Sequence, residues 1–365
     1  MNSWTETQFD SVVELQRGHD LPTPERAVGN IPVIGSFGIT GYHNETRYQG
    51  PGIAIGRSGA AIGTATYVDG PFWPLNTCLF VRDFKGNCPL WIYYLLKSMD
   101  FAQFNSGSAQ PSLNRNYLRD LTVLLPPARE QRAIAEVLGA LDDKIAANEQ
   151  LITLSEELAI AYASGATSST EVKRIATHST RSSSPDNFQE TVAHYSLPAF
   201  DASAQPSIEP ARSIKSNKFT LTIPSVLISK LNPRISRVWN VSEIGHIQAV
   251  ASTEFVVLEP IGCSTSVLWS LLCQPEFMTY IASRVAGTSG SHQRVKPAEI
   301  LSAPVGDPDS LNTNVRDLID SLGRHIDSAR KESQVLARTR DELLPLLMSG
   351  KLRVKDAEKK VEAIA

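Results

Sequence analysis

Apolar residues recur at alternating steps of four and three in two long stretches of this chain. The first stretch runs from Ile134 to Tyr162 and the second from Val315 to Leu343, and one offset of 181 residues superimposes them. A repeat of 3.5 residues held for about four heptads is typical of helices that pack along a seam. Each stretch would form a helix roughly 43 Å long at about 1.5 Å per residue. We therefore predict two long helices that pair with each other, the alternative being two unrelated core helices. The predicted seam residues are Leu138, Leu141, Ile145, Ile152, Ile319, Leu322, Ile326, Leu336 and Leu343.

A short polar phrase, Ser-Gly-Ser-x-Gln, occurs at residues 106–110 and again at 289–293. Each copy precedes one of the predicted long helices, so the chain is interpreted as a duplicated unit of a globular part followed by a helix. The predicted fold class is α+β, with two α/β domains in tandem. Within the second domain we expect Phe219–Ser229 to form paired strands and Val267–Arg284 to form a helix. The predicted segments are 1–125 (first domain), 126–165 (central helix), 166–306 (second domain), 307–350 (C-terminal helix) and 351–365 (charged tail).

The composition is that of a globular protein, with 42% hydrophobic and 20% charged residues over 365 positions. No run approaches the roughly 18 consecutive apolar residues of a membrane-spanning helix. The N-terminal sequence is acidic and lacks the apolar centre of a secretory signal. We therefore expect a cytoplasmic protein.

Neither a metal site nor a catalytic centre is expected. The cysteines, Cys78, Cys88, Cys263 and Cys273, lack zinc-ligand spacing, and two of them lie in apolar contexts typical of buried free thiols. The sequence also lacks the glycine-rich phosphate-binding motifs and the Gly-x-Ser-x-Gly nucleophile motif. We predict that the chain performs no chemistry and holds no cofactor itself.

The net charge of −3 does not suggest a nucleic-acid binder, but the charge is unevenly distributed. Between Pro210 and Ser242 there are six basic residues and no acid, and such a strip can bind a polyanion. Arg and Lys read guanine, Asn and Gln read adenine, and Ser contacts bases or phosphates. Several loops offer these side chains, although Ser, Asn and Gly also favour ordinary solvated turns. The candidate DNA contacts are Arg47, Arg57, Ser58, Ser106, Ser108, Gln110, Asn114, Arg115, Asn116, Lys230, Asn232, Arg234, Ser291, His292, Gln293, Arg294 and Lys296.

Three segments of the first copy resemble the specificity subunit of type I restriction-modification systems. They are the glycine turn 56–63, the polar segment 106–116, and Leu-Pro-Pro-Ala-Arg-Glu-Gln at 125–131, which leads into the first long helix. The resemblance extends over nearly the whole chain, from about Trp4 to Leu352. The second copy departs from it, because Gly-Asp-Pro-Asp-Ser-Leu at 306–311 replaces the Pro-Pro-x-x-Glu-Gln entry.

The resemblance implies two target-recognition domains, each reading one half of a split DNA sequence. It also implies that the two helices form an antiparallel coiled coil that carries two modification methyltransferase subunits. Those subunits use S-adenosylmethionine, and two restriction subunits driven by ATP and Mg²⁺ join them in a full nuclease; none of these cofactors would belong to this chain. The alternatives are a coiled-coil scaffold with carbohydrate- or protein-binding domains, and a self-sufficient enzyme, which the missing motifs disfavour.

Overall fold

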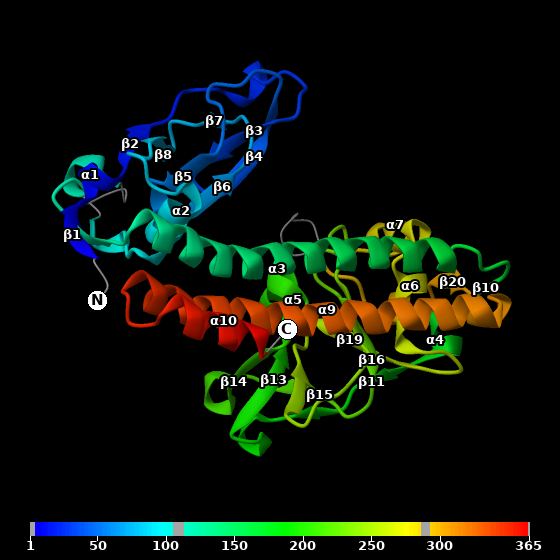
Figure 1. The fold of residues 1–365 in the computed structure, drawn as a ribbon. Helices are drawn as coiled ribbons and strands as arrows, with labels where there is room; N and C mark the ends of the chain where they lie inside the picture. The colour runs from blue at the N-terminus through cyan, green and yellow to red at the C-terminus, as the bar shows by residue number, and fades with distance from the viewer. Residues whose placement is uncertain (1–3, 105–112, 286–292, 364–365) are drawn as a thin grey trace. The chain divides into compact units, whose positions relative to one another are not determined.

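The computed structural model describes residues 4–104, 113–285 and 293–363. Contacts divide the chain into a first unit, Met1–Ile145 with Val335–Ala365, and a second unit, Ala146–Gln334. The division falls inside the two longest helices, α3 (Ala128–Ala163) and α9 (Thr313–Met348), which are the two long coils in Figure 1. Each of these helices therefore contributes residues to both units.

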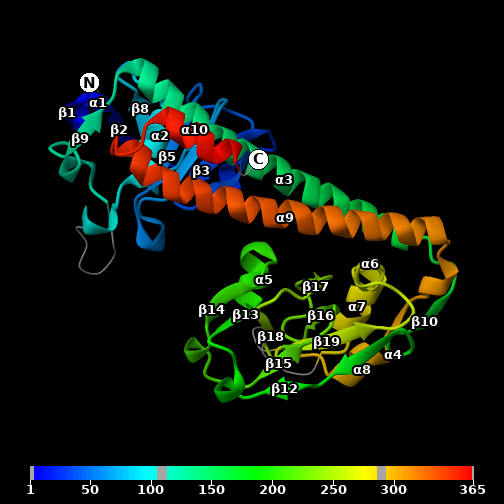
Figure 2. The same ribbon diagram turned by 60° about the horizontal axis from the view of Figure 1, so that its bottom comes forward.

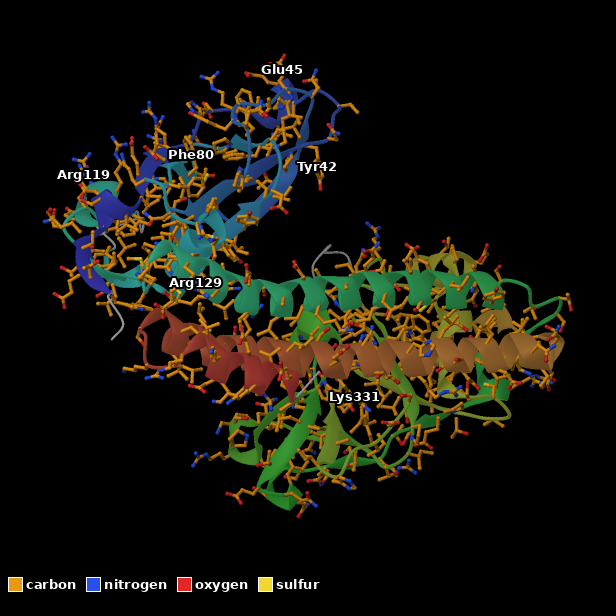
Figure 3. The ribbon with its side chains drawn as sticks, in the orientation of Figure 1. Tyr42, Glu45, Phe80, Arg119, Arg129 and Lys331 are labelled. Atoms are coloured by element: carbon orange, nitrogen blue, oxygen red, sulfur yellow. The ribbon has the colours of Figure 1, made fainter. Side chains whose placement is uncertain are left out.

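The first unit contains two small sheets beside the helix α2. An antiparallel sheet has the strand order β2-β8-β5-β6, and a second sheet has the order β4-β3-β7 with β3 parallel to β7. Phe80, labelled in Figure 3, belongs to an apolar cluster that joins the two sheets. The bounds are β1 Thr5–Gln8, α1 Phe9–Val12, β2 Glu14–Arg17, β3 Ile31–Gly35, β4 Gly38–His43, β5 Gly52–Gly56, β6 Ala65–Val68, β7 Trp73–Pro74, β8 Cys78–Asp83, α2 Pro89–Ser98, β9 Thr122–Leu125 and, near the C-terminus, α10 Val354–Glu362.

The second unit contains a four-stranded antiparallel sheet, β11-β19-β16-β17, and a five-stranded sheet, β12-β15-β18-β13-β14. The helix α6 lies between the four-stranded sheet and α9 (Figure 2). The bounds are β10 Ser169–Glu171, α4 Val172–Ile175, β11 Ala176–Ser179, β12 Ser182–Ser183, β13 Thr191–Tyr195, α5 Leu197–Ser203, β14 Ser207–Pro210, β15 Lys218–Leu221, β16 Ser225–Ser229, β17 Val238–Val241, β18 Gln248–Ala251, β19 Phe255–Pro260, α6 Thr265–Leu272, α7 Pro275–Ser283, α8 Pro297–Leu301 and β20 Pro304–Gly306.

The two units repeat one plan. The order β2-β8-β5-β6 corresponds to β11-β19-β16-β17, and the pair β1–β9 corresponds to β10–β20. The order β4-β3-β7 likewise corresponds to β14-β13-β18, with one parallel pair in each. In each unit a short helix meets a long helix at a glycine: a Cβ at Gly139 would come within 3.1 Å of Leu90 on α2, and one at Gly323 within 2.2 Å of Ser266 on α6. Among the described residues, the second unit also has the strands β12 and β15 and the helices α5, α7 and α8.

Within each unit α3 and α9 share an apolar core. In the first unit Ile134 near the start of α3 joins Leu347 near the end of α9, and in the second unit Ala163 at the end of α3 joins Ile319 near the start of α9. Asn148 donates a hydrogen bond of 2.8 Å to the Glu332 carboxylate within the second unit. Of the predicted seam residues, Ile145 and Ile152 are partly buried, and those that are buried are Leu138, Leu141, Ile319, Leu322, Ile326, Leu336 and Leu343.

The two long helices begin differently, because their entry sequences differ. At the start of α3 the Gln131 side chain is 2% exposed; it donates to the Asn87 amide at 2.8 Å and accepts from the Cys88 backbone N–H at 2.9 Å. At the start of α9, Asn312 accepts from the Val315 N–H at 3.1 Å, which satisfies a backbone donor in the first turn. Gln131 thus attaches the start of α3 to residues of its unit, whereas Asn312 caps the helix that follows it.

One segment that was expected to be helical is divided into two helices, and one expected strand pairing is wrong. Val267–Arg284 contains two helices, α6 and α7, because Pro275 fixes its own φ and begins a new helix. Phe219–Ser229 contains β15 and β16, but these lie in different sheets: β15 pairs with β12 and β18, and β16 pairs with β17 and β19.

Candidate nucleic-acid interface

In the first unit the fold brings two of the polar segments together. The Leu113 N–H donates to the Arg57 carbonyl at 2.8 Å, so the residues that follow β5 lie against those that precede β9. Arg57, Ser58, Asn114, Arg115 and Asn116 therefore belong to one surface. The Asn114 side chain accepts from the Asn116 N–H at 3.0 Å, and this bond caps a short turn that holds Arg115.

Two arginines that sequence reasoning missed lie on this surface. Arg17 on β2 and Arg82 on β8 line the same pocket of about 580 Å³ as Arg57 and Arg115. Arg17 and Arg57 both donate to the Asn76 carbonyl, at 3.2 and 3.4 Å. Burial lowers the pKa of Arg57, and the positive charge of Arg17 lowers it further. Four guanidinium groups around one pocket form a site that attracts an anion.

The second unit joins the equivalent segments in the same way. The Val295 N–H donates to the Lys230 carbonyl at 3.0 Å, and the Asn232 N–H donates to the Gln293 carbonyl at 2.9 Å. Asn232 adopts a left-handed backbone, with φ 48°, which asparagine tolerates better than most residues. This turn places the segment from Lys230 to Arg234 beside the segment from Gln293 to Lys296.

The two surfaces occupy the same place in the repeated fold. Arg57 is the first residue after β5, and Lys230 is the first residue after the corresponding strand β16. In both, the carbonyl of that basic residue accepts a hydrogen bond from the segment that leads toward the last strand of the unit. We call these two surfaces the paired loops of the first and second units.

The charges of the second paired loops are partly balanced. The Arg294 guanidinium binds the Glu254 carboxylate at 2.9 and 3.1 Å, and this bond raises the pKa of Arg294. Burial lowers the pKa of His178, and the positive charge of Lys230 lowers it further, so both effects favour the neutral imidazole. Arg234 and Lys296 are exposed. The basic groups of this surface that would attract a polyanion are thus Lys230, Arg234 and Lys296.

The other predicted contacts fall into two groups. Arg47 lies in the connection between β4 and β5, where its guanidinium stands 5.8 Å from the centre of the Trp73 ring. It is not part of the paired loops as defined by their backbone hydrogen bonds. Five predicted contacts lie outside the described residues: Ser106, Ser108, Gln110, Ser291 and His292.

In the described parts of the chain, no three His, Cys, Asp or Glu side chains converge as metal ligands would. The cysteines are free thiols, and burial raises the pKa of Cys78 to about 12. A thiol with so high a pKa is a poor nucleophile at neutral pH. Nor does any helix among the described residues have the length and apolar character needed to span a membrane.

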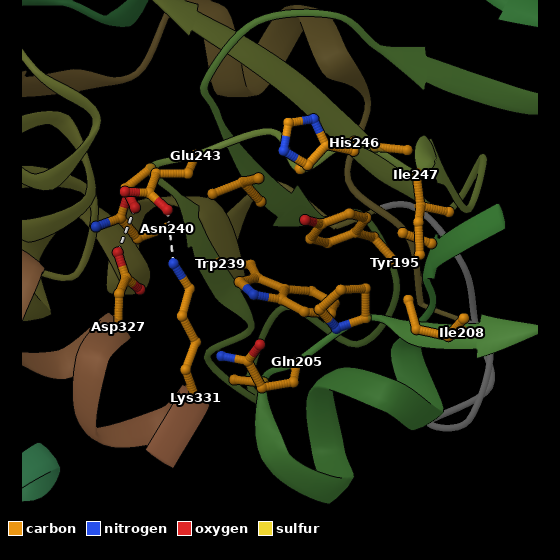
Figure 4. A pocket seen from close by; sticks show the side chains of 17 residues that line it. Tyr195, Gln205, Ile208, Trp239, Asn240, Glu243, His246, Ile247, Asp327 and Lys331 are labelled. Carbon is orange, nitrogen blue, oxygen red and sulfur yellow. Dashed lines mark hydrogen bonds and ion pairs between the residues drawn. The ribbon is translucent and has the colours of Figure 1, made fainter. Parts of the chain in front are cut away.

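A separate pocket of about 370 Å³ lies in the second unit (Figure 4). Tyr195 and Trp239 form an aromatic wall, with ring centres 4.8 Å apart. At the other end Lys331 binds Glu243 at 2.6 Å, and Ser242 donates to Asp327. Burial raises the pKa of Asp327. These four side chains therefore already have partners within the unit.

Fold and site together define a duplicated α+β protein with two long helices and two equivalent polar surfaces. Residues 1–156 match the family described as type I restriction modification DNA specificity domain. The chain is 32% identical over 111 residues to the type I restriction enzyme EcoprrI specificity subunit of Escherichia coli, an alignment that covers 30% of this chain and 28% of that protein. It is 27% identical over 119 residues to a putative type I restriction enzyme specificity subunit of Haemophilus influenzae, covering 32% of this chain and 31% of that protein.

The alignments thus span less than a third of either curated relative. The fold is similar over a greater length: the crystal structure of a type I restriction-modification system S subunit from M. genitalium superimposes with a TM-score of 0.63. That likeness covers 95% of this chain and 96% of the other, at 16% identity. Residues 1–156 thus match the model of the type I restriction-modification DNA specificity domain, and part of the chain is similar to type I specificity subunits.

Proposed function

We propose that this chain is the DNA-recognition subunit of a type I restriction-modification complex, and that each unit reads one half of a bipartite target. The observation that carries this proposal is the presence of paired loops at the same place in both repeats, each beginning with a basic residue, Arg57 or Lys230. Asn, Gln, Arg and Lys side chains recognise base edges and phosphates. Two such surfaces on a duplicated scaffold suit a target in two parts.

The long helices pair as an antiparallel coiled coil in this proposal. This proposal is supported by the apolar cores of the two units. In the first unit the start of α3 packs in one core with the end of α9, and in the second unit the end of α3 packs in one core with the start of α9. Asn148, 3% exposed, and its bond to Glu332 interrupt the apolar seam. A single polar residue of this kind fixes the register of paired helices.

The partners are two methyltransferase subunits, which bring S-adenosylmethionine, and two restriction subunits with ATP and Mg²⁺ where the complex also cleaves DNA. This chain supplies recognition and no catalysis. A stripe of apolar side chains on α3 suits a protein partner: Leu151, Leu154, Leu158 and Tyr162 are 47%, 55%, 44% and 38% exposed. Their spacing of three, four and four residues places them on one helix face.

Replacing both Leu154 and Leu158 with glutamate is expected to weaken methyltransferase binding at least tenfold, because charged groups would enter an apolar contact. Both side chains are exposed, so thermal stability should stay near that of the wild type. The measurement is the Kd between the chain and the methyltransferase subunit. A matched control places glutamate at Ala146 and Thr153, exposed on another face of α3; equal loss in both variants would contradict docking on the stripe.

The alternative is a scaffold whose domains bind a carbohydrate or a protein. The pocket beside Tyr195 and Trp239 is the feature that favours it. In the first unit the pocket beside the paired loops is lined by arginines and by no aromatic side chain. The scaffold alternative predicts no DNA binding even when the methyltransferase partner is present.

The test is the pattern of methylated adenines in a host genome with and without this chain. Deletion is expected to abolish methylation at one motif with two separated halves. Methylation that persists unchanged at every motif would overturn the proposed function.

A further inference from the structure

The β3–β4 hairpin, which is part of the sheet β4-β3-β7, carries exposed apolar side chains that lie outside the core of the first unit. The turn between β3 and β4 consists of Ser36 and Phe37, and Phe37 is 74% exposed. Ile39 and Tyr42 on β4 are 48% and 55% exposed, and Tyr42 points away from the strands (Figure 3). Single exposed apolar side chains are common on protein surfaces, so the place of Phe37 beside the paired loops, and not its exposure alone, indicates a contact with a ligand.

The turn is continuous with the paired loops of the first unit. The Ser36 hydroxyl lies 3.4 Å from the Ser58 hydroxyl. The Ser36 carbonyl also approaches Gly56 so closely that a Cβ there would stand 2.5 Å from it. Phe37 is therefore the neighbour of a residue that packs directly against the start of the Arg57 loop.

The corresponding hairpin of the second unit is built differently. Its strands β13 and β14 are joined by the helix α5 instead of a two-residue turn. Asp201 on α5 binds Arg237 at 2.6 and 2.9 Å, which attaches α5 to the segment between β16 and β17. In both units the hairpin connection thus borders the loop after β5 or β16, yet its length and chemistry differ. Two repeats that share a scaffold and differ at this place are suited to read different bases.

We propose that the β3–β4 hairpin enters the major groove and that Phe37 contacts the methyl group of a thymine in the half-site read by the first unit. This inference rests on the proposed DNA-recognition function. Because β7 pairs with β3 on its other side, the contact with the bases is assigned to the Ser36–Phe37 turn. Apolar side chains, including Phe, distinguish thymine in the major groove by its methyl group. Arg57 and its neighbouring arginines supply the phosphate contacts that hold the turn in place.

The test is a double-mutant cycle on the complete complex with its methyltransferase subunits and the methylated duplex. Phe37→Ala is expected to lower affinity about tenfold. Replacing one thymine of the half-site with uracil, which removes only the methyl group, should lower wild-type affinity by a similar factor and leave the F37A complex unaffected. The dependence of affinity on salt should stay the same, because no charge is lost.

Val28→Ala is the matched control, because Val28 is fully exposed and the adjacent Gly29 lies beside His43, at the far end of β4. This control should bind as the wild type does. The assignment of Phe37 would be overturned if uracil lowered the affinity of the wild-type and F37A complexes equally, or if F37A bound with wild-type affinity. Neither result would overturn the proposed function. A wild-type complex that does not prefer its motif over random duplex would instead overturn the proposed function.

Discussion

Replacing Leu141 with aspartate is expected to destabilise the first unit by about 4 kcal/mol or more. Removing a buried leucine side chain alone costs about 2–5 kcal/mol, and burying a carboxylate without a partner adds to that cost. Leu141 is 1% exposed and shares a core with Leu336 and Leu343 of α9. Denaturant unfolding of the full chain, followed by far-ultraviolet circular dichroism, measures the effect.

Leu154→Asp is the matched control, because Leu154 is on the same helix and is 55% exposed. It should change the free energy of unfolding by no more than about 0.5 kcal/mol. Equal destabilisation by the two substitutions would show that burial along the seam does not distinguish these positions.

Replacing Arg57 and Lys230 with alanine is expected to have the largest effect on DNA binding. Each substitution removes a basic group at the equivalent place in one unit, and each should cost about 1–3 kcal/mol of binding free energy. The two residues lie in different units, so their effects should add. The double variant should therefore lose roughly 30-fold to 20,000-fold in affinity, given about 1.4 kcal/mol per tenfold.

The measurement is the Kd of the methyltransferase complex for its target duplex at one fixed salt concentration, with Arg129→Ala as control. Arg129 is exposed on the first turn of α3, outside the paired loops (Figure 3). Loss of affinity in R129A equal to that in R57A would mean that only overall charge matters. A double variant no weaker than either single variant would contradict two independent surfaces.

The apolar repeat was sufficient to predict the two long helices, because a period of 3.5 residues held over 29 positions has few other physical explanations. The repeat also predicted the duplication, since the two apolar stretches and the two Ser-Gly-Ser-x-Gln phrases are separated by nearly the same number of residues. The short strands were harder, because four or five apolar residues carry little periodic signal. The division of 219–229 between two sheets depends on pairing with distant strands, which no local pattern encodes.

Prediction from the local sequence was limited in the same way at the paired loops. Arg57 and Asn114 could be selected from the sequence as polar residues in turns, but their adjacency arises from the Leu113–Arg57 hydrogen bond. Arg17 and Arg82 were missed because they lie on strands, far from any polar loop phrase. Phe37 was missed because an apolar residue is interpreted as part of the core until its exposure is known. Only the fold places the adjacent residue, Ser36, beside Ser58.

The most direct test of the account is to exchange residues 1–125 for those of another specificity subunit and to sequence the methylated adenines of the host. One half of the motif is expected to change, while the other half and the spacer between them stay as they were. A change in both halves, or in neither, would contradict independent reading by the two units.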